Sequence, residues 1–177
     1  LWHLGTVTAA CLASVGHDVV GLAGDFNNIN NLKQGKGPLF EPGLDEMIQK
    51  EIYEGHLRFA QNSREAVADA EVLWVTFDTP VDEEDQADVE FVLNKVKSVL
   101  PFLKDETVVL ISSQIPVGSV QKLEHFVKDN YSSKQICFAY SPENLRLGKA
   151  IDVFLNPDRI VVGVRTDETK KILEKLF

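Results

Sequence analysis

The chain begins with LWHLGTVTAACLASVGHDVVGL, Leu1–Leu22, and this stretch decides the fold that the sequence predicts. Gly5 opens a run of small residues that let a helix pack closely on a sheet: Thr6, Thr8, Ala9, Ala10 and Ala13. The next segment, residues 16–22, has the apolar, β-rich composition of a buried strand. A glycine turn that opens such a helix normally follows a strand of its own, so we expect a first strand upstream of Leu1.

Composition limits the kinds of protein that this chain can be. Its 177 residues, 44% of them hydrophobic, suit one globular domain. The formal net charge of −9 argues against nucleic acid and against anionic membrane surfaces as partners. Cys11 and Cys137 sit among apolar neighbours without metal-ligand spacing, so we expect core thiols and no metal site. The sequence also lacks a membrane-spanning run and a signal peptide, and we therefore expect a cytoplasmic protein.

Strand-like and helix-like segments alternate along the chain. Strands are predicted at residues 17–22, 57–60, 72–77, 107–112, 136–140 and 160–164. Helices are predicted at residues 6–15, 44–53, 63–69, 89–99, 119–128 and 166–177. This order predicts an α/β, Rossmann-like, doubly wound parallel sheet with helices on both faces. Ligands of such sheets collect at the carboxyl ends of the strands.

The helix opened by Gly5 has two interpretations. In a dinucleotide-binding unit, the backbone N–H groups at such a helix start face a pyrophosphate. Alternatively, the small residues only pack the helix against a sheet. This stretch by itself does not decide between them.

Five stretches together resemble the nucleotide-sugar dehydrogenases of the UDP-glucose/GDP-mannose 6-dehydrogenase type. They are HLGTVTAACLASVGHDVVGL, NNLKQGKGPLFEPGLDEMI, VTFDTP, SSQIPVGSV and SPENLRLGKAIDVFLNPDRIVVG, in family order. The resemblance implies NAD as cofactor and an NDP-sugar, similar to UDP-glucose, as substrate. The sugar's C6 hydroxymethyl would be oxidised to a carboxylate in two hydride transfers, through a thioester on a cysteine. Residues 1–177 then look like the N-terminal NAD-binding domain alone, inactive without the substrate domain and joined into a homodimer or larger oligomer through missing regions.

The resemblance assigns the cofactor to the first glycine turn and to three later positions. The expected contacts are Trp2, His3, Leu4, Gly5, Asp25, Thr79 and Ser113. Trp2 replaces the family's second glycine. Ala23 replaces its ribose-binding acid, and Asp25, two residues on, either reaches the ribose or is a solvated turn residue. The acid of FEPG, Glu41, either caps and turns the chain or borders the cleft.

Catalysis is implied at two strand ends. Glu143, in SPENLRLG, occupies the position of the family glutamate that handles the water hydrolysing the thioester, and general acid/base work suits a carboxylate at a cleft mouth. Gln114 stands where the family has a water-orienting threonine, with Ser113 as the neighbouring hydroxyl. Asn144 and Leu145 would contact the sugar nucleotide through backbone groups. A second family glutamate is Leu147 here.

Two functions stay open. The first is the NDP-sugar dehydrogenase, with this chain supplying its NAD-binding half. The second is a non-catalytic nucleotide-binding module or degenerate relative, which the residues Ala23, Gln114 and Leu147 favour. The sequence does not name the sugar.

Overall fold

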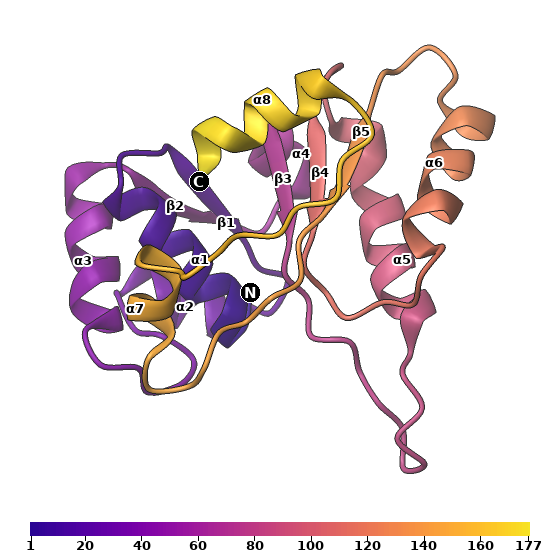
Figure 1. Cartoon of the computed structure of the whole chain (residues 1–177). Coiled ribbons are helices and arrows are strands. Elements are labelled where there is room, and N and C mark those ends of the chain that lie inside the picture. Colours follow the sequence, from indigo (N-terminus) through magenta and orange to yellow (C-terminus); the bar gives the residue numbers. More distant parts are fainter. The chain divides into compact units, whose positions relative to one another are not determined.

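The computed structural model describes residues 1–25 and 27–177 in full and residue 26 by its backbone alone. Two compact units make up the chain. Unit 1 comprises residues 1–66, 144–160 and 176, and unit 2 comprises residues 67–143, 161–175 and 177. Both are built on parallel strands (Figure 1). The expected α/β, Rossmann-like class, with parallel sheets and helices on both sides, is confirmed.

Unit 1 contains a pair of parallel strands, β1 (Val19–Leu22) and β2 (Leu57–Ala60), in a register that sets Val19 opposite Leu57. Its helices are α1 (His3–Ser14), α2 (Phe26–Lys33), α3 (Leu44–Glu54) and α7 (Ala150–Leu155), and α4 (Ser63–Val67) ends at the boundary. The core forms where α1 meets the strands, α3 and α7, and it includes the small residues of the opening stretch. Ala10, Cys11 and Ala13 are fully buried there, which is why α1 needs small side chains.

Unit 2 contains three parallel strands in the order β3 (Val72–Val75), β4 (Val108–Ile111) and β5 (Cys137–Tyr140). Every residue of the central strand β4 is fully buried, as its unbroken apolar run predicts. The helices are α5 (Val89–Val99), the 3₁₀ turn η1 (Leu100–Phe102), α6 (Ser119–Asn130) and α8 (Asp167–Leu176), whose last residue is assigned to unit 1. Figure 1 shows α5 and α6 side by side, and Lys97 of α5 lies over the ring of Phe126 of α6, 5.3 Å from its centroid.

The prediction of a strand at residues 160–164 is wrong. Only Gly163 pairs there, in an antiparallel bridge to Tyr140. Ile160 and Val161 are about half exposed, so their β-branched side chains are not held in the buried environment that a central strand requires. Helices α2 and α7 were not predicted. Whether a strand precedes α1 stays a prediction.

Candidate functional site

The start of α1 presents free backbone donors. The first hydrogen bond within the helix runs from Thr6 N–H to the Trp2 carbonyl at 2.9 Å, so the N–H groups of His3, Leu4 and Gly5 have no partner within α1. Trp2, the N-cap residue, is extended and its half-exposed side chain forms no cap. The first turn carries no acid. This is the geometry that suits an anion, since N–H groups and the positive end of the helix dipole coincide.

Asp25 turns out to be a helix cap. Its Oδ1 accepts a hydrogen bond from Asn28 N–H at 2.7 Å and so begins α2, a role that neither sequence interpretation included. Its carboxylate is exposed, and contact with a ribose stays a prediction. Ala23 is buried and its N–H continues the β1–β2 pairing to Ala60 at 3.1 Å.

Glu41 is a buried carboxylate with structural partners. Its Oε2 accepts from Gly148 N–H at 2.7 Å and its Oε1 accepts from Ala150 N–H at 2.8 Å. His3 Nε2 lies 3.5 Å from Oε2. Glu41 therefore caps α7, more than a hundred residues away, rather than α3, whose start has no side-chain cap. That Glu41 borders the cleft stays a prediction.

The ends of β3 and β4 bring three expected residues together. The Thr79 hydroxyl donates to the Gln114 carbonyl at 2.6 Å. Ser113 is buried, and its Oγ has no hydrogen-bond partner among the described residues. Its neighbour Ser112 accepts a bond from Trp74 Nε1 at 2.8 Å. The Gln114 side chain is exposed beside this pair and is free to hold water.

The chain after β5 carries the remaining site residues. Ser141 is anchored by a bond from its Oγ to the Val161 carbonyl at 3.0 Å. Glu143 is half-buried, Asn144 is exposed, and Leu145 packs against the core of unit 1. Because β3, β4 and β5 are adjacent and parallel, Thr79, Ser113, Gln114 and Glu143 follow the carboxyl edge of one sheet.

The other expected site residues belong to unit 1. They are Trp2, His3, Leu4, Gly5, Asp25, Asn144 and Leu145. That these and the unit 2 residues line a common crevice stays a prediction.

Both cysteines are free thiols. Burial of Cys11 and, to a smaller degree, the negative charge of Glu41 raise its pKa to about 12. A thiol with that pKa holds its proton at physiological pH and is a poor nucleophile.

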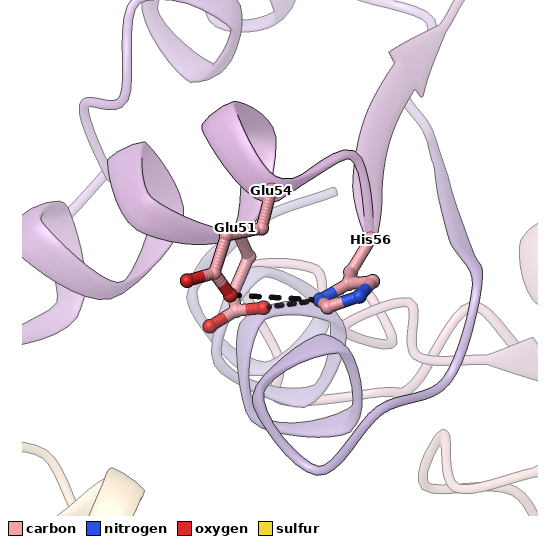
Figure 2. Close-up of side chains that lie close together, drawn as sticks. All are labelled: Glu51, Glu54 and His56. Atoms are coloured by element: carbon pink, nitrogen blue, oxygen red, sulfur yellow. Dashed lines mark hydrogen bonds and ion pairs between the residues drawn. The ribbon is translucent and has the colours of Figure 1, made fainter.

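One cluster on unit 1 has side chains of the kind that bind metal ions. Glu51, Glu54 and His56 bring ligand atoms within 4.8 Å of one another, and Figure 2 shows both carboxylates facing the imidazole. His56 Nδ1 lies 3.0 Å from Glu51 Oε2 and 3.7 Å from Glu54 Oε2. However, the Lys50 ammonium already lies 3.1 Å and 3.5 Å from the two carboxylates, so a cation would have to displace it.

That cluster behaves as an ion-pair network. Burial of Glu51 raises its pKa, but hydrogen bonds from His56 and Lys50 outweigh burial and hold the pKa below its ordinary value. The cluster therefore ties Lys50 and His56 to the carboxylates at the end of α3.

The whole chain, residues 1–177, matches the UDP-glucose/GDP-mannose dehydrogenase family, NAD binding domain. The chain belongs to this family. A UDP-glucose 6-dehydrogenase of Rhizobium meliloti is 36% identical over 92% of the chain, and one of Bacillus subtilis is 31% identical over 99%. The chain spans 37% and 40% of the lengths of these two relatives.

Solved structures of the family share the fold. A GDP-mannose dehydrogenase from Pseudomonas aeruginosa superposes with a TM-score of 0.90 at 26% identity, covering 98% of this chain and 41% of that one. A UDP-glucose dehydrogenase from Pyrobaculum islandicum gives a TM-score of 0.90 at 28% identity, with the same coverage. The resemblance drawn from the five motifs is thus confirmed.

NAD is the cofactor of the matched domain, and groups in the structure fit it. The uncapped first turn of α1 suits its pyrophosphate, and the buried Ser113 hydroxyl lacks a partner that a ligand or water would supply. Among the residues that the structure describes, no helix combines the length and apolar character needed to cross a membrane.

Proposed function

We propose that this chain is the NAD-binding part of an NDP-sugar 6-dehydrogenase that oxidises the C6 hydroxymethyl of a UDP-glucose-like substrate to a uronic acid. The match of all 177 residues to the family's NAD-binding domain carries the proposal. Support comes from the relatives, which are named UDP-glucose 6-dehydrogenases. Bound NAD would supply the hydride acceptor for each of the two oxidation steps.

The proposed cofactor contacts use groups that the structure describes. The first turn of α1, Trp2 to Gly5, would hold the pyrophosphate through backbone N–H groups. Thr79 and Ser113 would contact the cofactor at the ends of β3 and β4. Thr79 already donates its hydrogen to Gln114, so it would accept rather than donate unless that bond breaks. Asp25 would offer the adenosine ribose the carboxylate oxygen that does not cap α2.

The chemical roles lie at the carboxyl edge of the unit 2 sheet. Glu143 would take a proton from the water that hydrolyses a thioester, with the amide of Gln114 or the hydroxyl of Ser113 orienting that water. Asn144 and Leu145 would bind the sugar nucleotide through backbone groups. The cysteine that forms the thioester would lie outside these 177 residues, because Cys11 holds its proton too firmly and Cys137 sits within β5.

The alternative is a nucleotide-binding module without catalysis. Ala23 is buried where the family has an acid, and Leu147 exposes two thirds of its surface where the family has a second glutamate. Homo-oligomer formation and a cytoplasmic location also stay predictions.

Turnover by the full-length protein separates the two functions. We expect it to reduce two NAD per molecule of uronic acid formed from UDP-glucose or GDP-mannose, measured by absorbance and by mass spectrometry of the sugar. Residues 1–177 alone should bind NAD and release no acid. If the full-length protein binds NAD but oxidises neither sugar, the binding module is the better description.

A further inference from the structure

Glu41 joins two parts of unit 1 that are distant in sequence. Its two carboxylate oxygens each accept one backbone N–H, from Gly148 and from Ala150, at 2.7 and 2.8 Å. Ala150 is the first residue of α7, so the carboxylate supplies the N-terminal cap that Lys149, the N-cap residue, does not form. Glu41 is only 5% exposed, and hydrogen bonds to a buried charge are strong.

The same carboxylate meets the first residue of α1. His3 Nε2 lies 3.5 Å from Glu41 Oε2, the oxygen that also accepts from Gly148. Both ring nitrogens of His3 are buried, and neither has a hydrogen-bond partner among the described residues. The His3 imidazole thus lies beside the Glu41 carboxylate and forms no hydrogen bond with any other described residue.

The segment that Glu41 holds, Asn144–Gly148, carries the proposed substrate contacts Asn144 and Leu145. Gly148 comes three residues after Leu145, and Leu145 packs against the same core as α1. With Leu145 packed at one end and two N–H groups fixed at the other, the backbone of Asn144–Gly148 has few conformations open to it.

We propose that Glu41 is a positioning residue that couples the first turn of α1 to the substrate segment Asn144–Gly148. Ordering of the first turn by a bound cofactor would restrict the His3 ring, which lies 3.5 Å from the Glu41 carboxylate, and that carboxylate holds the turn before α7 through two N–H groups. The inference rests on the proposed function, because it takes α1 as the cofactor helix and Asn144–Leu145 as substrate contacts.

Glu41→Gln in the full-length protein is the sharpest test. The variant keeps the size of the side chain, but its NH₂ group would face a backbone N–H, so one buried donor loses its acceptor. We expect the KM for the sugar nucleotide to rise about 10- to 100-fold, with a smaller change in kcat, as expected when charge-assisted hydrogen bonds are lost. The Kd for NAD should change less than the KM, because no cofactor contact is removed.

Amide hydrogen exchange provides a readout that does not depend on turnover. Exchange at Gly148 and Ala150 should quicken at least about tenfold in Glu41→Gln, the factor that about 1.4 kcal/mol of lost protection produces. NAD should slow exchange at both amides in the wild type and should do so much less in His3→Phe. Glu41→Asp keeps the charge on a shorter side chain and should fall between the wild type and Glu41→Gln in KM and in exchange.

Glu51→Gln is the matched control, because Glu51 is also a buried glutamate of unit 1 with a histidine beside its carboxylate. It should leave the KM and the exchange at Gly148 and Ala150 unchanged. An equal effect in Glu51→Gln, or unchanged exchange in a folded Glu41→Gln, would overturn the coupling. If Glu41→Gln does not fold, His3→Phe with an undiminished NAD effect overturns it.

Failure of the proposed function has a different signature. If the wild type binds NAD but oxidises no sugar, the proposed function fails. The exchange experiment then still tests the coupling, because it needs NAD binding and no turnover. A wild type that does not bind NAD rejects both.

Discussion

The hydroxyl of Thr79 donates a hydrogen bond to the backbone carbonyl of Gln114 at 2.6 Å. This bond joins the chain after β3 to the chain after β4, at the carboxyl edge where ligands of parallel sheets collect. Thr79→Val keeps the shape and removes the bond, so we expect NAD to bind the full-length protein roughly 2- to 10-fold more weakly. Thr79→Ser should restore the affinity in a fluorescence titration. Equal weakening in both variants would show that the methyl group matters instead.

Ser113→Ala should separate stability from activity. The Ser113 hydroxyl is buried without a partner among the described residues, so removing it should leave the free energy of unfolding unchanged or raise it by up to about 1 kcal/mol. If the hydroxyl contacts cofactor or water, kcat/KM should nevertheless fall about tenfold, the effect of losing one hydrogen bond of about 1.4 kcal/mol. Denaturant unfolding and steady-state kinetics check the two effects. A destabilised variant with normal kinetics would contradict the prediction.

Glu143→Gln should stop the reaction at the covalent stage. Loss of a general base typically slows the step that it serves by about 10²- to 10⁴-fold. The full-length variant, mixed with sugar nucleotide and NAD, should therefore show an adduct on a cysteine outside residues 1–177 by mass spectrometry. Release of acid at the normal rate, with no adduct, would mean that Glu143 has a structural role only.

Because of Cys11, the free energy of unfolding should fall as the pH becomes alkaline. Its pKa is about 12 in the fold and 9.0 when unperturbed, so the unfolded chain loses this proton first. The stabilisation that the fold gains from the raised pKa of Cys11 is fully present below pH 9 and is lost as pH rises from 9 to 12. Between pH 8 and pH 10.5 the wild type should lose about 2 kcal/mol more than Cys11→Ala. Parallel pH curves for the two proteins, from denaturant unfolding, would rule this out.

NAD should bind more tightly than NADP. No Arg or Lys occurs between Leu22 and Lys33 to meet a 2′-phosphate. Titrating the full-length protein with both cofactors tests the preference, and tighter NADP binding would refute it. Asp25→Asn keeps an oxygen that can cap α2, so a loss of NAD affinity in this variant would place the Asp25 charge at the ribose.

Local patterns were sufficient for most of the elements. The small residues after Gly5, the fully apolar β4 and the glycine before α6 each specify their element by sterics or burial alone. Helix α2 was not predicted because FNNINNLK holds four asparagines, which favour turns, and only its cap at Asp25 marks a start. The apolar run at residues 160–164 predicted a strand, but neighbouring strands decide whether such a run is buried.

The sequence by itself determined the α/β class, the family and the residues at the strand ends, because these follow from periodicity and from motifs in order. Only the tertiary structure decided which hydrogen-bond partners those residues have and how deeply they are buried. Glu41 meets N–H groups 107 and 109 residues away, Thr79 bonds the Gln114 carbonyl, and Ser113 is buried without a partner. Hydrogen-bond partners and burial depend on which segments the fold brings into contact. A local sequence pattern does not predict contacts between segments that are a hundred residues apart.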